Sequence, residues 1–212
     1  MKRGFTLLEI LIALALTSLV LVALNTFMFS MGELWGRNTD LRLFDRHVRS
    51  VTRFLEHELR VAALPPVGTT GQAPIAAEDI HTQSGATETL LTFELPEGSR
   101  MFVWPGQPLP EVVCSLAMRE GTGLVFLWHS RLEKHFDDQP PRETLITPLV
   151  TALSYDYYDS GFKNWKNETV IRKNAQGEYE APQRLHLKFV YRTHAQEVVI
   201  PLATVTEGLP PF

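Results

Sequence analysis

The sequence predicts an α+β protein, in which a long N-terminal helix, transmembrane first and amphipathic afterwards, packs on a mostly antiparallel β-sheet domain. Two observations predict this fold. Residues 5–63 carry apolar residues at helical spacing and contain no proline, since the first prolines are Pro65 and Pro66. Residues 89–202 instead carry short apolar runs separated by turn residues, which is typical of antiparallel strands.

The first thirty residues combine a basic start with a long apolar run. Lys2 and Arg3 precede Gly4, and the run from Phe5 to Phe29 contains Glu9 as its only charged side chain. Because helical residues rise about 1.5 Å each, this run spans roughly 37 Å, enough to cross a bilayer core. Basic residues before an apolar helix stay in the cytoplasm. We therefore expect a single-pass protein of the cytoplasmic (inner) membrane with an exported C-terminal part.

The sequence around Glu9, and the charge of its side chain, restrict the possible classes of N-terminal segment. A conventional signal peptide needs a short apolar region followed by a small-x-small cleavage site, and residues 25–29 offer none. A plain transmembrane anchor leaves Glu9 unexplained, because an unpaired carboxylate inside a bilayer is costly. A third hypothesis, that Glu9 merely snorkels to the headgroups, stays open at this point.

Residues 3–9 read Arg-Gly-Phe-Thr-Leu-Leu-Glu and closely resemble the type III signal of type IV pilins and type II secretion pseudopilins. The resemblance implies that a prepilin peptidase cuts between Gly4 and Phe5 on the cytoplasmic side and N-methylates Phe5. It also implies that Glu9 neutralises the N-terminal amine of a neighbouring subunit. Opposite charges attract strongly at low dielectric, while each alone is expensive. Assembly would thereby depend on processing, which creates that amine.

After Phe29 a smaller part of the helix surface is apolar, and this apolar side continues almost to Pro65 and Pro66. It forms one stripe at helical spacing, made of Leu34, Leu41, Phe44, Val48, Val51, Leu55 and Leu59. The expected organisation is a leader peptide at 1–4, a transmembrane helix at 5–29, an amphipathic helix at 30–64 and a periplasmic β-rich domain at 65–212.

The exported part is predicted to begin with a loop at 65–88, which is rich in Gly, Pro, Ala, Thr and Gln. The string Glu-Gly-Thr-Gly at 120–123 predicts a hairpin. Strand-like runs are found at 89–95, 99–104, 111–119, 124–130, 145–158, 184–191 and 198–202. Together these runs predict one mostly antiparallel sheet on the second half of the helix.

Several segments beyond the signal resemble the J-type minor pseudopilin of type II secretion systems. These segments are 53–60, 123–128, 153–159 with Trp165, and 181–187, and their order matches over most of the chain. The resemblance implies a pilin-like fold and a place in the pseudopilus tip complex, which primes filament assembly. The implied partners are the I- and K-type minor pseudopilins, the major pseudopilin, prepilin peptidase and the inner-membrane secretion platform.

Two departures from that family leave a second hypothesis open. The 65–88 loop is poor in aromatic and arginine residues, and no second tryptophan lies shortly upstream of Trp165. A minor pilin of a type IV pilus or of a competence (DNA-uptake) filament is therefore the alternative.

Other functions find little support in the sequence, and we expect no enzyme, cofactor or metal. His57-Glu58 lacks a second histidine at zincin spacing. Asp156 and Asp159 lie near a turn where carboxylates can bind calcium, although ordinary strand-end residues are the favoured interpretation. Residues 30–212 hold 18 basic and 23 acidic residues, which argues against a nucleic-acid partner. The single cysteine, Cys114, excludes an intrachain disulfide and is expected in the core.

Overall fold

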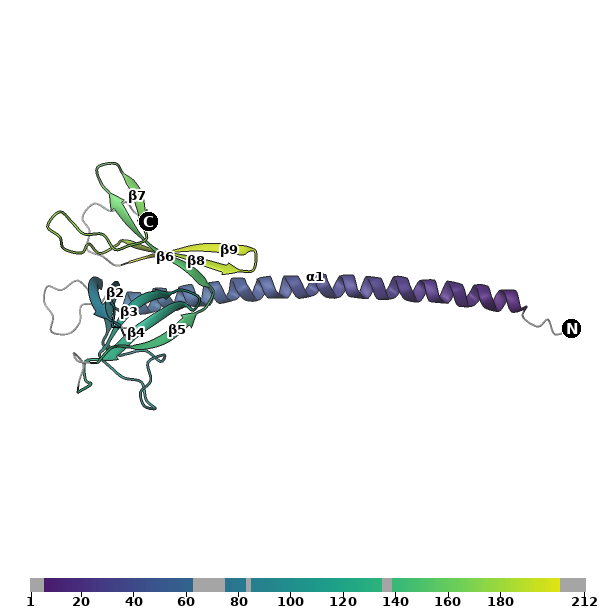
Figure 1. Cartoon of the computed structure of the whole chain (residues 1–212), viewed down its shortest axis with the longest axis horizontal. Helices are drawn as coiled ribbons and strands as arrows, with labels where there is room; N and C mark the ends of the chain where they lie inside the picture. Colours follow the sequence, from purple (N-terminus) through teal and green to yellow (C-terminus); the bar gives the residue numbers. More distant parts are fainter. Residues whose placement is uncertain (1–5, 63–74, 83–84, 135–138, 203–212) are drawn as a thin grey trace. The chain divides into compact units, whose positions relative to one another are not determined.

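A single helix dominates the N-terminal part of the chain (Figure 1). The computed structural model describes residues 6–62, 75–82, 85–134 and 139–202, without the side chains of 33–38. Helix α1 runs from Leu7 to Ala62, which confirms the predicted helix over these residues; Phe5 and Ala63 lie outside the described part. The chain divides into two compact units, residues 1–47 and 48–212, and α1 contributes to both. We call the second of these the globular unit.

The strands of the globular unit form two antiparallel sheets, so the predicted α+β class is confirmed. The first sheet is a meander with strand order β1-β2-β3-β4-β5, and the second has the order β7-β6-β8-β9. The first sheet comprises β1 (Ile75–His81), β2 (Thr87–Leu95), β3 (Val112–Arg119), β4 (Gly123–Ser130) and β5 (Arg142–Thr147). The second comprises β6 (Val150–Asp159), β7 (Asn164–Glu168), β8 (Arg184–Tyr191) and β9 (His194–Pro201).

The prediction of a single strand at 145–158 was wrong, and its failure explains why there are two sheets. The apolar run contains Pro148, which cannot donate a ladder hydrogen bond. Strand β5 therefore ends at Thr147, and β6 begins at Val150. Because β6 pairs with β7 and β8 rather than with β5, the chain starts a second sheet here.

Four further parts of the strand prediction need correction. Strand β1 lies inside the predicted 65–88 loop and pairs with β2, with Ile75 opposite Phe93. Residues 99–104 form turns instead of a strand, and only an isolated bridge joins Val103 to Pro108. The edge strand β7 was not predicted, and β9 begins at His194 rather than at Val198.

The predicted hairpin at 120–123 is confirmed, and Gly123 shows why glycine is needed there. Its φ is 112°, a conformation that other residues rarely adopt. A Cβ atom at this position would lie 2.2 Å from the carbonyl oxygen of Thr147, which is backbone and cannot yield. The glycine thus lets β4 lie close to the end of β5.

The core of the globular unit forms between the last turns of α1 and the first sheet. Val48, Val51, Leu55 and Leu59 of the predicted stripe are buried, each at most 7% exposed. The ring of Phe54 meets Phe126 of β4 edge-on at 6.2 Å between centroids. Phe126 also meets Phe93 and Phe102 at 5.9 and 5.6 Å. Edge-to-face rings at these distances add stabilisation beyond the burial of apolar area.

Candidate functional site at the start of helix α1

The predicted site residues fall on both sides of the described boundary. Gly4 and Phe5 lie outside the described residues, so the cleavage and methylation positions stay predictions. Glu9 lies in the first turn of α1, which begins at Leu7 directly after Thr6. The site can therefore be built from Thr6 onward.

Thr6 and Glu9 form a reciprocal capping box at the start of α1. The Thr6 backbone N–H donates to Glu9 Oε2 at 2.8 Å, and the Thr6 hydroxyl donates to the same oxygen at 3.0 Å. The Glu9 N–H in turn donates to Thr6 Oγ1 at 3.4 Å. The first N–H groups of a helix lack intrahelical partners, and this arrangement satisfies two of them. Glu9 is therefore held in a defined position by its own helix.

The segment after the capping box is long and apolar enough to cross a membrane. It runs from Leu7 to Gly32, 26 residues, and its most apolar 18-residue stretch has a mean hydropathy of 2.7; none of it is buried in the monomer. Leucine side chains on every side are exposed, for example Leu8 at 67% and Leu19 at 68%. A helix that is apolar all round is stable only when other apolar matter covers it. We call Leu7–Gly32 the apolar segment.

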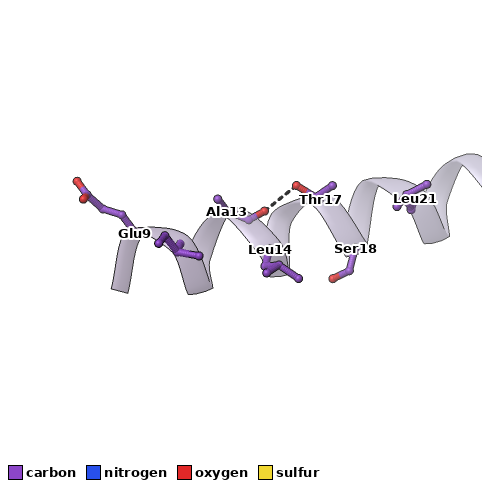
Figure 2. A pocket seen from close by; sticks show the side chains of 7 residues that line it. Glu9, Ala13, Leu14, Thr17, Ser18 and Leu21 are labelled. Atoms are coloured by element: carbon purple, nitrogen blue, oxygen red, sulfur yellow. Dashed lines mark hydrogen bonds between the residues drawn. The ribbon is translucent and has the colours of Figure 1, made fainter. Parts of the chain in front are cut away.

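Polar side chains in the apolar segment bond to their own helix. Thr17 Oγ1 donates to the Ala13 carbonyl at 2.7 Å, and Ser18 Oγ donates to the Ala15 carbonyl at 2.8 Å. These bonds hide hydroxyl groups from an apolar surrounding. Figure 2 shows the Glu9 carboxylate extending from the helix end, while the neutral side chains further along line a shallow hollow. The hollow is lined by Glu9, Ile10, Ala13, Leu14, Thr17, Ser18 and Leu21.

Comparison with protein families identifies this N-terminal region. Residues 1–25 match the model of the prokaryotic N-terminal methylation motif. The chain carries a prokaryotic N-terminal methylation motif. Type IV pilins and pseudopilins share this motif, so it indicates a protein of pilin or pseudopilin type without distinguishing the two. No curated protein and no solved structure matches the chain.

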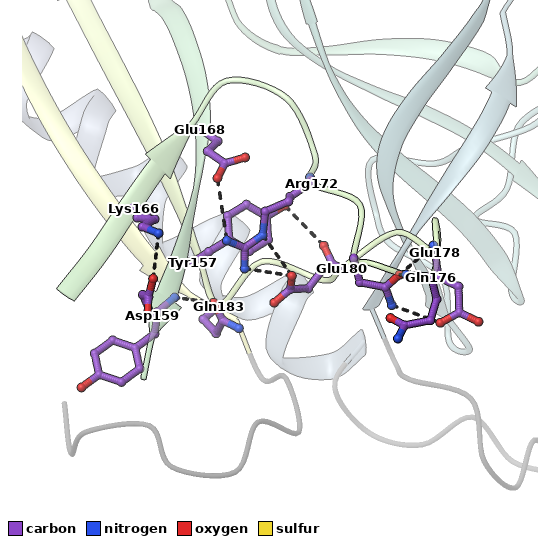
Figure 3. Close-up of polar contacts among 11 residues, drawn as sticks. Tyr157, Asp159, Lys166, Glu168, Arg172, Gln176, Glu178, Glu180 and Gln183 are labelled. Carbon is purple, nitrogen blue, oxygen red and sulfur yellow. Dashed lines mark hydrogen bonds and ion pairs between the residues drawn. The ribbon is translucent and has the colours of Figure 1, made fainter. Parts of the chain in front are cut away.

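Outside the methylation motif, the carboxylates that sequence analysis considered for calcium already have protein partners. Asp156 accepts a hydrogen bond from Asn167 Nδ2 at 2.6 Å. Asp159 forms an ion pair with Lys166 at 2.7 Å, visible in Figure 3, and this neighbour lowers the pKa of the Asp159 carboxyl. In the part of the chain that the structure describes, no three His, Cys, Asp or Glu side chains lie close enough to hold a metal ion.

A second polar cluster, also drawn in Figure 3, fixes the connection between β7 and β8. The Arg172 guanidinium lies 4.6 Å from the centroid of the Tyr157 ring and pairs with Glu180 at 2.8 Å. The Tyr157 hydroxyl accepts the Arg172 N–H at 3.1 Å and donates to the Glu180 carbonyl at 3.3 Å. The polar groups of Arg172, Tyr157 and Glu180 thus bind one another, which gives the cluster a structural role.

Two features of helix α1, one at each end, were missed at the level of sequence. Thr6 was noted only as a polar interruption, although Thr-x-x-Glu is the spacing of a capping box. Glu58 was expected on a polar side of the amphipathic helix and was otherwise considered in the His57-Glu58 pair and the 53–60 segment. It is in fact buried at 8% exposure and accepts a hydrogen bond from the Ser99 hydroxyl at 3.3 Å. Burial raises the pKa of the Glu58 carboxyl.

Proposed function

We propose that the chain is a non-enzymatic minor pseudopilin of a type II secretion system. It is cut between Gly4 and Phe5, N-methylated at Phe5, and anchored in the inner membrane until it joins the periplasmic pseudopilus. The observation that carries this proposal is the methylation motif at the start of an apolar segment with Glu9 as its one charge. The minor, J-type assignment rests on the sequence resemblance at 53–60, 123–128, 153–165 and 181–187.

The capping box suggests how Glu9 acts in assembly. Thr6 occupies Oε2 twice, and no described residue donates a hydrogen bond to Oε1. A carboxylate accepts on both oxygens. Oε1 can therefore take the methylated amine at Phe5 of a neighbouring subunit while Oε2 keeps the helix capped. In an apolar surrounding the pairing is favourable because each charge alone is costly there.

Mass spectrometry of the intact protein tests the processing step. The full chain is co-expressed with a prepilin peptidase and purified in detergent. We expect the mass of residues 5–212 plus one methyl group, with fragmentation placing that methyl on the Phe5 amine. A chain that keeps residues 1–4 contradicts the proposal at its base.

Substitution of Glu9 tests the assembly step. Glu9→Ala should still be cleaved and methylated, yet its recovery in filaments or the tip complex should fall at least about tenfold, since 1.4 kcal/mol of lost pairing suffices for that. Ser18→Ala is the matched control, because the Ser18 hydroxyl bonds only to its own helix. Normal incorporation of the Glu9→Ala protein contradicts the charge-pairing account.

The proteins that co-purify with the processed chain separate secretion from the alternative. I- and K-type minor pseudopilins and the major pseudopilin support the proposal. Subunits of a type IV pilus or of a competence filament in their place keep the pilin-type class and move the function to the alternative. The departures at 65–88 and around Trp165 are the sequence features that favour this alternative.

A further inference from the structure

The second half of α1 carries a row of basic side chains along one side. Arg49, Arg53, His57 and Arg60 of the globular unit are all exposed and are spaced four, four and three residues apart. The spacing continues toward the N-terminus of the same helix with Arg46 and Arg42, which are also exposed. At about 100° per residue, all six lie within a sector of about 80°. We call these six residues the arginine row.

The arginine row lies opposite the buried face of its helix. The buried residues Val48, Val51, Leu55 and Leu59 are centred about 200° around the helix from the row. Around the helix axis, Arg49, Arg53, His57 and Arg60 therefore lie on the side that faces away from the core of the globular unit. The row is about 27 Å long, because its ends are separated by about 18 steps of about 1.5 Å.

Four arginines of the row differ in their partners from several arginines of the β-rich part of the chain. Among described residues, no ion pair is formed by Arg42, Arg46, Arg53 or Arg60. Elsewhere in the globular unit, arginines pair with carboxylates in Arg119–Glu88, Arg131–Glu94, Arg142–Glu133 and Arg172–Glu180. A concentration of such cations in a protein of net charge -4 produces a local positive field that favours an acidic partner.

The borders of the row indicate which acidic partner fits. Leu43, 56% exposed, and the half-buried Val61 lie along one border, while Asp45 and Glu56 lie along the other. Apolar contacts beside charges of both signs are typical of protein interfaces, whereas carboxylates repel a phosphate backbone. A lipid surface fits poorly, because a row along the axis of a membrane-crossing helix extends beyond the thin headgroup layer.

The spacing within the row further suggests a helical partner. Arg46, Arg53 and Arg60 are seven residues apart, and so are Arg42 and Arg49. Charges at seven-residue intervals flank the contact between two helices packed side by side. We propose that the arginine row binds a carboxylate-lined helix of a second pilin-type subunit. This inference rests on the proposed function, because it assumes that such subunits assemble together.

A photo-crosslinking experiment tests the proposal in the cells that make the protein. The full chain carries benzoylphenylalanine in place of Ser50, which is exposed beside the row. We expect an adduct with another protein that has a methylation motif, through a helical peptide with more acidic than basic residues. The triple variant Arg46→Glu, Arg53→Glu, Arg60→Glu should lower the adduct yield at least about tenfold.

The control variant changes the same amount of charge elsewhere. Arg100→Glu, Lys134→Glu and Lys163→Glu alter three exposed cations outside the row, and the adduct should keep its yield. Lysine substitutions at the carboxylates of the crosslinked peptide should restore the adduct in the triple variant. Circular dichroism of the purified variants checks that the fold is kept.

Other results overturn the inference. One is an adduct that the triple variant leaves unchanged, and another is no adduct at all. A third is binding of the detergent-solubilised chain to a 30-base-pair DNA duplex, or to vesicles with anionic lipid, that the triple variant loses and the control variant keeps. The intact mass separates this failure from that of the proposed function. A chain with a methylated Phe5 that enters filaments through Glu9 but ignores the row refutes this inference alone.

Discussion

The two halves of α1 share a backbone conformation and differ in how their side chains are covered. In the apolar segment, leucines such as Leu16 are exposed on every side of the monomer. After Val48, one side of the helix is buried in the globular unit and the opposite side carries arginines. The first half thus depends on lipid or other subunits for its stability, while the second depends on its own domain.

Two leucine-to-alanine substitutions, one in each half of α1, test this difference and have the largest expected effect. Leu55→Ala, at a side chain 1% exposed, should lower the free energy of unfolding of the globular unit by about 2–5 kcal/mol. Leu16→Ala, at a side chain 60% exposed, should change it by less than about 0.5 kcal/mol. Urea titration of the detergent-solubilised chain, followed by near-ultraviolet circular dichroism, measures both. Equal losses would mean that the apolar segment is part of the same folding unit.

Two carboxylates of α1, the exposed Glu9 and the buried Glu58, sharpen the comparison. Because burial raises the pKa of Glu58, the folded state keeps the proton at pH values where the unfolded chain has released it. Stability is therefore full below pH about 4 and is lost as pH rises through the folded pKa. Glu58→Gln removes this loss and should therefore raise the free energy of unfolding, and with it the Tm, at pH 7.

Thermal unfolding at several pH values measures the effect of Glu58→Gln. The gain over the natural sequence should shrink toward zero as the pH falls to about 4. Glu9→Gln is the control, because Glu9 is exposed and lies outside the globular unit, and it should leave this Tm unchanged. A gain that is independent of pH would assign the effect to packing instead of charge.

Two threonines give the smallest expected effect. Thr6→Val removes the hydroxyl of the capping box and should destabilise the first turn of α1 by about 0.5–1 kcal/mol. Amide exchange at Leu7, Leu8 and Glu9 in micelles should then be several-fold faster. Thr52→Val is the control, because the Thr52 hydroxyl donates only to the Val48 carbonyl. Unchanged exchange in Thr6→Val would show that the cap contributes nothing in a micelle.

The elements with strong apolar periodicity could be predicted from sequence. Strand β8 buries alternate residues, β3 and β4 each bury six consecutive residues, and the second half of α1 buries one stripe, so their patterns are visible in a single sequence. The edge strands β1 and β7 bury little more than Ile75, and they lack such a pattern. The 99–104 run resembled a strand because it contains the apolar residue Phe102. The Phe102 side chain is indeed buried, but it lies in a loop whose backbone is restricted by Pro105 and Pro108.

The sequence predicted which residue acts at the candidate site, but not the hydrogen bonds that position its side chain. A short motif indicates the role of Glu9, because the processing signal is read from sequence. The bonds from Thr6 depend on backbone positions at the helix start, and only the structure shows them. The arginine row is visible in the spacing from 42 to 60, yet a count of charges over residues 30–212 hides it among more numerous carboxylates.

The Cys114 thiol can report how often the globular unit unfolds. The side chain is fully buried in β3, and burial raises the pKa of the thiol well above its ordinary value. A thiol reagent attacks the exposed thiolate, so the folded domain resists it. With one cysteine in the chain, every alkylated molecule has opened at this strand. The rate of alkylation therefore measures how often the domain unfolds, without any introduced label and also inside an assembled filament.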